Sequence, residues 1–227
     1  VYGSPKVAAY HRKVLNIINF NFNNIRSVAE AHPKKVNLVN CLGDDVHVEL
    51  GKSTPEGGQA SLAALEAAAT DLMAGRIDVL VTAPIDKSNI QSDKFRFTGH
   101  TDYLRSKAGS GEALMLMISE SMKIGFVTEH LPLKDVPGSI TIGNILTKLR
   151  LLNKSLLQDF AIRGPRIGVL SLNPHAGDGG LLGHEEKDII SPAITKANEE
   201  GILAFGPYSS DGFFGSGAFS RFDAVLA

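Results

Sequence analysis

Apolar residues recur along the chain with helical spacing in some segments and as short continuous runs in others, and this pattern predicts an α/β fold. Helices are expected over 5–15, 58–75, 101–108, 141–160 and 185–199. Short apolar runs predict strands over 36–42, 46–50, 77–83, 113–119, 123–129, 166–172, 202–206 and 222–227. Strands that alternate with helices are typical of a largely parallel sheet, with helices on both faces. Only the pair 113–119 and 123–129, joined by a few residues, is expected to be antiparallel.

Polar segments punctuated by proline or glycine follow three of the expected strands. Residues 84–87 (Pro-Ile-Asp-Lys) follow 77–83, His130 follows 123–129, and 173–180 (Asn-Pro-His-Ala-Gly-Asp-Gly-Gly) follows 166–172. Ligands of open α/β sheets bind outside the carboxyl ends of strands. The three segments therefore predict one shared site.

Two histidines in these segments, His130 and His175, are candidate metal ligands. Their separation in sequence carries no metal signature, but imidazole at a strand end is a common ligand. For each histidine alone, a structural hydrogen bond is the simpler interpretation, and the two interpretations are balanced when the pair is considered together. A catalytic metal site usually has three protein ligands, so a third ligand must come from elsewhere.

A second group of residues is suited to binding an anion. His100 and Thr101 stand where the helix 101–108 begins, with Thr101 a possible N-cap, and a helix N-terminus favours phosphate or carboxylate. Lys87 could add a positive charge, and the glycines of 173–180 would let backbone amides approach an anion. The alternatives are an ordinary capped helix with a solvated histidine, a solvated lysine and a tight strand-to-helix loop.

The amino-acid composition narrows the class of protein but does not indicate which reaction it catalyses. The chain of 227 residues is 43% hydrophobic and 21% charged, with a net charge of −1, so nothing favours nucleic acid or an anionic membrane as a partner. No apolar run is long enough to span a bilayer. The single cysteine, Cys41, excludes an internal disulfide and favours a reducing, cytoplasmic location. Dinucleotide-fingerprint, P-loop and nucleophile-elbow motifs are absent from the sequence.

The ends of the sequence suggest that residues are missing from both. The sequence opens on Val1 without a methionine, and it closes on 222–227, an expected strand that stops in mid-run. Within 1–227 we expect two intertwined α/β lobes around a cleft, with no boundary marked by composition.

Read together, four segments resemble one enzyme family. Val-Thr-Ala-Pro-Ile-Asp-Lys (81–87), Gly-His-Thr-Asp (99–102), His-Leu-Pro-Leu-Lys-Asp-Val-Pro (130–137) and Leu-Asn-Pro-His-Ala-Gly-Asp-Gly-Gly (172–180) occur in this order. The chain is similar over nearly its whole length to the 4-hydroxythreonine-4-phosphate dehydrogenase family of vitamin B6 biosynthesis. This resemblance implies a two-lobed, isocitrate-dehydrogenase-like fold with an active-site cleft.

The resemblance also assigns roles to residues. It implies that His130 and His175 bind a metal ion and that His100 and Thr101 contact the substrate. A third metal histidine would lie in a Tyr-His-Asp-Gln-Gly block that directly follows a strand like 223–227. No residue that binds the nicotinamide cofactor is assigned.

The activity that the resemblance implies is oxidation of 4-phosphooxy-L-threonine by NAD or NADP, with decarboxylation to 3-amino-2-oxopropyl phosphate. The metal is expected to be Zn²⁺, with Mg²⁺ or Co²⁺ as alternatives, and the enzyme is expected to be a homodimer with a shared active site. The remaining alternatives are a dehydrogenase of 4-hydroxythreonate or of a cyclic dihydrodiol, a metal-dependent phosphohydrolase, and a non-catalytic binding relative. Residues that depart from the usual family pattern bear on this choice: Asp86, Asp102, Asp178 and His184.

Overall fold

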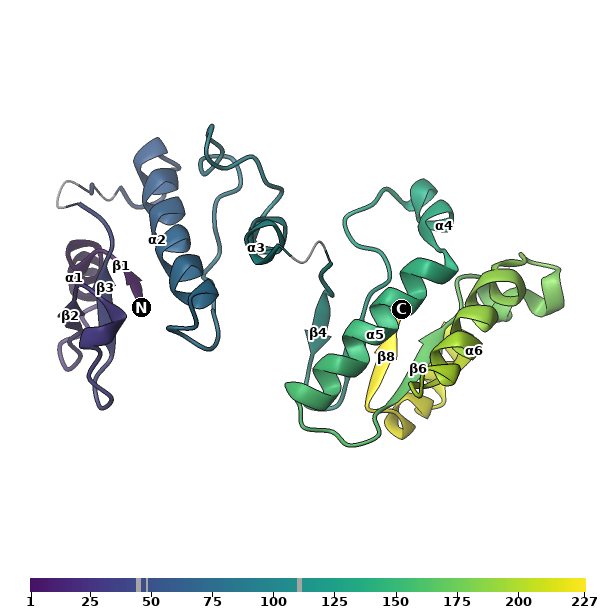
Figure 1. The fold of residues 1–227 in the computed structure, drawn as a ribbon. Coiled ribbons are helices and arrows are strands. Elements are labelled where there is room, and N and C mark those ends of the chain that lie inside the picture. The colour runs from purple at the N-terminus through teal and green to yellow at the C-terminus, as the bar shows by residue number, and fades with distance from the viewer. Residues whose placement is uncertain (44–45, 48, 110–111) are drawn as a thin grey trace. The chain divides into compact units, whose positions relative to one another are not determined.

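A computed structural model describes residues 1–43, 46–47, 49–109 and 112–227. It divides the chain into two compact units, Val1–Glu112 and Ala113–Ala227 (Figure 1). The interpretation of these units as intertwined lobes around a cleft stays a prediction.

The first unit combines a small parallel sheet with three helices. The sheet has the order β1-β3-β2, and its strands are β1 (Tyr2–Gly3), β2 (Asn23–Ile25) and β3 (Asn37–Asn40). The helices are α1 (Pro5–Val14), α2 (Pro55–Met73) and α3 (His100–Ala108), with a short 3-10 turn, η1, at Val28–Glu30. Ser4 and Thr54 accept hydrogen bonds from the first-turn amides of α1 and α2, which fixes where these helices begin.

An apolar cluster joins α2 to α3 and holds the start of α3 in place. Its buried members are Leu62, Leu65, Ala69, Ile90, Phe95 and Tyr103. The ring of Tyr103 lies 5.5 Å from those of both Phe95 and Phe97, centroid to centroid. Aromatic groups bury large apolar areas, so this cluster anchors the helix that carries His100.

The second unit contains a five-stranded sheet with the order β4-β5-β8-β6-β7. Its strands are β4 (Leu116–Ile118), β5 (Lys123–Gly125), β6 (Arg166–Leu170), β7 (Leu203–Tyr208) and β8 (Ala224–Leu226). Only β4 and β5 pair antiparallel, and the other neighbours are parallel. Its helices are α4 (Val136–Ser139), α5 (Ile142–Gln158), α6 (Ser191–Glu199) and α7 (Ser210–Gly215), with turns η2 (Leu133–Asp135), η3 (Pro174–Gly180), η4 (Glu186–Ile190) and η5 (Ala218–Arg221).

The two faces of this sheet are covered differently. Helices α5 and α6 lie across one face (Figure 1), where Ile167 and Val169 join the main apolar core. The intervening Gly168 faces the opposite side, and a Cβ there would lie 3.0 Å from Phe213 and 3.3 Å from Phe222. The alternation along β6 therefore builds an α/β layer on one side and an aromatic layer on the other.

Most expected elements are confirmed, including the helices and the antiparallel pair, but two strands are not. The buried strand expected at 77–83 is wrong, because the segment forms no strand and leaves Val79 73% and Val81 88% exposed. The strand expected at 46–50 falls partly on residue 48, outside the described residues, and its described residues are not in a strand. A strand needs a hydrogen-bonding neighbour, and an apolar run cannot specify one.

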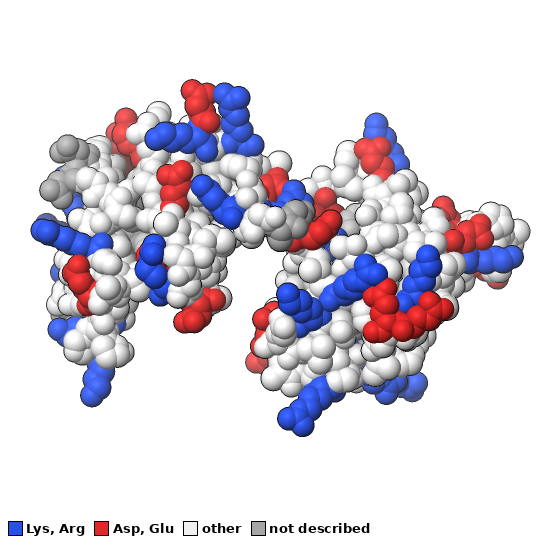
Figure 2. Space-filling model, in the orientation of Figure 1, with Lys and Arg blue, Asp and Glu red and all other residues white. Residues whose placement is uncertain are grey.

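Surface features add little about partners. Among the described residues, no helix has the length and apolarity needed to cross a membrane. Lys and Arg side chains are interspersed with Asp and Glu over the drawn face of each unit (Figure 2). Cys41 is half-buried, and burial raises the pKa of its thiol.

Candidate functional site

His130 and His175 lie beyond the carboxyl ends of two strands of the same sheet. His130 follows β5 and His175 follows β6, and both strands run parallel to β8, which lies between them. The ladder continues past the ends of β5 and β8, because the Val127 amide donates to the Ala227 carbonyl at 2.8 Å. The structure therefore brings these two sequence-predicted residues to one edge of the sheet.

Both histidines are solvent-exposed and have left-handed backbone conformations. The φ angles are 56° at His130 and 52° at His175. A non-glycine residue adopts such an angle at a cost of about 1–2 kcal/mol. Residues in these strained conformations concentrate at functional sites. Two such conformations beyond the ends of strands at the same sheet edge support a functional edge over an ordinary pair of loops.

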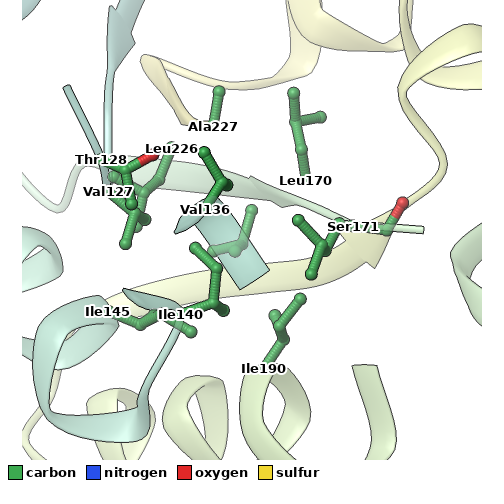
Figure 3. Close-up of a pocket in the computed structure, with 12 residues that line it drawn as sticks. Val127, Thr128, Val136, Ile140, Ile145, Leu170, Ser171, Ile190, Leu226 and Ala227 are labelled. Carbon is green, nitrogen blue, oxygen red and sulfur yellow. The ribbon is translucent and has the colours of Figure 1, made fainter. Parts of the chain in front are cut away.

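A small apolar cavity of about 100 Å³ lies within the carboxyl edge of this sheet (Figure 3). It is lined by Val127, Thr128, Val136, Ile140, Ile145, Val169, Leu170, Ser171, Leu172, Ile190, Leu226 and Ala227. Ligand pockets typically have volumes of about 300–1,000 Å³, so this cavity is too small for a nucleotide. This cavity therefore assigns no cofactor-binding residues.

Sequence reasoning missed a carboxylate at the same edge, that of Asp211. This residue lies in the first turn of α7, directly after β7, the neighbour of β6. The Ser209 hydroxyl hydrogen-bonds Asp211, and this bond, the Gly212 amide and the nearby His175 lower the pKa of its carboxyl. Applying the strand-end argument to the expected strand 202–206 would have found it.

The sequence-predicted substrate residues, His100 and Thr101, lie in the first unit at the start of α3. The expected Thr101 N-cap is wrong: Gly99 is the N-cap, no side chain caps the helix, and His100 is its first residue. The Gly99 backbone is extended (φ 165°), and Thr101 is exposed at the position after His100. How this unit lies relative to His130 and His175 stays a prediction.

The segment 86–88 lies beside His100 and carries two opposite charges. The side chain of Lys87 runs against Gly99, where a Cβ would lie 3.7 Å from Lys87 Cε. Hydrogen bonds from Ser53 and Ser88 lower the pKa of Asp86 to about 2. Burial, helped by the charge of Lys87, lowers the pKa of His100. At neutral pH the imidazole is therefore uncharged and Lys87 supplies the positive charge.

Removing that charge should raise the pKa of His100. We expect Lys87→Met to move it back toward 6.5, though not fully, because burial remains the larger cause. Since the folded-state pKa lies below the unfolded value, His100 reduces stability as the pH falls below about 6.5, and Lys87→Met should weaken this loss. The titration of the His100 ring protons by NMR measures the shift. Exposed Lys94→Met is the matched control, and equal His100 titrations in the two variants would contradict the assignment.

The metal-binding chemistry of the second unit is incomplete within the described residues. Two imidazoles suit Zn²⁺ or Co²⁺. Directly before His130, Glu129 Oε2 is buried without a hydrogen-bond partner in the described part of the chain. Nevertheless, the described residues contain no group of three or more His, Cys, Asp or Glu side chains placed to hold an ion. The role of His130 and His175 as metal ligands therefore stays a prediction.

The fold and the edge define the class: an α/β protein whose polar residues gather beyond parallel strand ends. The profile of the family described as "Pyridoxal phosphate biosynthetic protein PdxA" matches residues 1–227. The chain belongs to this PdxA family.

Relatives agree with that assignment. A 4-hydroxythreonine-4-phosphate dehydrogenase from Bacteroides thetaiotaomicron is 49% identical over all of this chain and 62% of its own length. One from Sulfurihydrogenibium sp. is 38% identical, over all of this chain and 69% of its own length. The chain therefore spans about 62% of the length of the first relative.

Solved structures show the same fold. A putative 4-hydroxythreonine-4-phosphate dehydrogenase from Salmonella typhimurium superposes with a TM-score of 0.88 at 25% identity, covering all of this chain and 70% of the other. The enzyme from Klebsiella pneumoniae gives 0.86 at 25% identity, covering all of this chain and 69% of the other. The expected isocitrate-dehydrogenase-like α/β class is confirmed by these neighbours.

Proposed function

We propose that the protein oxidises 4-phosphooxy-L-threonine with NAD or NADP and that the product loses CO₂ to give 3-amino-2-oxopropyl phosphate. The observation that carries the proposal is the position of His130 and His175 at one sheet edge, in a chain that the PdxA family matches along its length. In the reaction, hydride leaves the secondary alcohol carbon for the nicotinamide and the hydroxyl proton is released. The bond between the carboxylate and the α-carbon then breaks, the carboxylate departs as CO₂, and the α-carbon gains a proton.

His130 and His175 would hold a divalent cation, which when bound supplies Lewis acidity that favours ionisation of the substrate hydroxyl. Hydride acceptance belongs to the nicotinamide cofactor. His100 and Thr101 would bind the polar part of the substrate. Because the lowered pKa keeps His100 neutral, its ring would donate one hydrogen bond, and Lys87 would provide charge for an anionic group.

The finer points belong to the same proposal. Of the three metals considered, Zn²⁺ suits imidazole ligands best, with Mg²⁺ and Co²⁺ as alternatives. We also propose a homodimer with a shared active site, acting in the cytoplasm, where a lone cysteine such as Cys41 stays reduced.

The test is an assay of the protein expressed from its complete gene, with NAD or NADP, Zn²⁺, Mg²⁺ or Co²⁺, and 4-phosphooxy-L-threonine. We expect reduced nicotinamide to form with the phosphorylated substrate and to stop when a chelator removes the metal. Phosphate release without NAD would support a phosphohydrolase instead. Preferential turnover of 4-hydroxythreonate or a cyclic dihydrodiol would support those dehydrogenases, and binding without turnover a non-catalytic relative.

A further inference from the structure

The turn that carries His175 has an unusual backbone. Six consecutive residues have positive φ, from His175 at 52° through Ala176 at 53°, Gly177 at 77°, Asp178 at 44° and Gly179 at 66° to Gly180 at 109°. Three of them are not glycine, and each of these costs about 1–2 kcal/mol in a left-handed conformation. Such a turn persists only where its surroundings determine it.

A buried carboxylate, that of Glu186, supplies those surroundings. The residue is 5% exposed. Its Oε1 accepts hydrogen bonds from the Leu172 amide at 2.9 Å and the Asn173 amide at 2.7 Å, and its Oε2 accepts one from Asn173 Nδ2 at 2.9 Å. These donors are the last residues before the turn, so Glu186 fixes the direction in which the chain leaves β6.

The turn also closes around the same carboxylate. A Cβ at Gly177 would lie 2.6 Å from Glu186 Oε2, and one at Gly183 would lie 2.4 Å from Asn173 Nδ2. The Leu182 amide donates to the Gly177 carbonyl at 3.1 Å, which closes the loop behind the turn. The contacts leave no room for a side chain at either glycine, so the turn and the carboxylate fit one another.

Glu186 is itself held by the core. It is the first residue of η4, a π-helical turn that ends at Ile190 and leads directly into α6. Ile190 is 3% exposed and belongs to the main apolar cluster. Single π-helical turns occur frequently at functional sites. Burial disfavours the charged form, but hydrogen bonds from Asn173 and Leu172 outweigh it and hold the pKa of Glu186 below its usual value.

We propose that Glu186 is the positioning residue for His175, holding the left-handed turn so that the imidazole stands ready to bind the metal ion. This inference rests on the proposed function, in which His175 is a metal ligand. Glu186 does not touch the reacting atoms and acts only through the turn.

The test measures Co²⁺ binding to the protein expressed from its complete gene. Glu186→Gln keeps the size of the side chain but turns one acceptor oxygen into a donor that faces another donor. We expect Co²⁺ affinity to fall about 10–100-fold, the range for partners that orient metal ligands, with an altered visible Co²⁺ spectrum and unchanged far-ultraviolet circular dichroism. Saturating Co²⁺ should restore most of the turnover. Asp188→Asn, an exposed carboxylate in the same π-helical turn, should bind Co²⁺ like the parent.

The outcomes separate this inference from the proposed function. If His175→Ala leaves Co²⁺ binding unchanged, the metal site itself is wrong. If His175→Ala abolishes binding while Glu186→Gln retains parental affinity and spectrum, only the positioning role is overturned. Should Glu186→Gln fail to fold, Gly177→Ala disturbs the same contact from the other side, and parental Co²⁺ affinity in that variant would overturn the positioning role.

Discussion

Replacing His175 or His130 with alanine is expected to lower nicotinamide reduction by at least about 100-fold and to remove most of the bound metal. Partners that only orient metal ligands cost up to about 100-fold when they are lost, and removing a ligand should cost no less. Neither imidazole is buried, so the loss of stability should be small. Metal content by elemental analysis and steady-state turnover, both in the protein from the complete gene, measure the two effects.

The variant that combines both substitutions tests whether the two histidines act as one unit. Groups that act as one unit are strongly non-additive, so His130→Ala combined with His175→Ala should be little worse than the more damaging single change. His11→Ala is the matched control, because His11 is an exposed imidazole on α1 and has no part in the proposed site. Parental metal content and turnover in both single variants would show that the sheet edge is not the metal site.

Local sequence predicts part of the candidate site. It placed His130 and His175 at the ends of β5 and β6, because an apolar run followed by polar, proline-containing turns has the same meaning wherever the sheet is parallel. The position of β8 between them depends on pairing between segments far apart in the sequence, so the hydrophobic pattern does not predict it. The roles of the two histidines as ligands stay a prediction.

The features that sequence could not supply are all non-local. The run 77–83 has the composition of a buried strand, but burial depends on a partner, and Val81 is 88% exposed. The glutamate pair 185–186 was expected to open a helix, and only the fold shows that Glu186 turns inward to the Asn173 amide. The left-handed turn at His175 follows from that contact, so the sequence Asn-Pro-His-Ala-Gly does not specify it by itself.

Replacing Gly58 in α2 with alanine gives the second large expected effect. The sign of the change in stability distinguishes the contribution of helix propensity from that of packing. Alanine is usually about 1 kcal/mol better than glycine inside a helix, so propensity alone predicts that Gly58→Ala stabilises the protein. In the structure a Cβ at Gly58 would lie 2.0 Å from the Asn89 carbonyl oxygen and 3.0 Å from the Ile90 amide nitrogen. Both are backbone atoms, so neither can rotate away.

Gly58→Ala is therefore expected to lower the free energy of unfolding by about 1–3 kcal/mol, the usual cost of overpacking. The segment that the added Cβ would displace, residues 89–90, is held at the start of α2 by a 3.1 Å hydrogen bond from Asn89 Nδ2 to the Thr54 carbonyl. It follows closely after Asp86 and Lys87 in the sequence. The pKa of His100, which depends partly on Lys87, should then shift as well. Urea unfolding gives the change in stability, and NMR titration gives the shift.

The neighbouring glycine provides the matched control for this change. A Cβ at Gly57 would lie 3.3 Å from Thr54 Oγ1 and 3.8 Å from Asn89 Nδ2, and both are side-chain atoms that can adjust. Gly57→Ala should therefore be neutral or slightly stabilising, as helix propensity predicts. Equal unfolding free energies for the two variants would mean that α2 does not pack against residues 89–90 as closely as the structure shows. A large difference, with Gly58→Ala the less stable, would establish that close backbone approach, and not local helix preference, fixes glycine at this position.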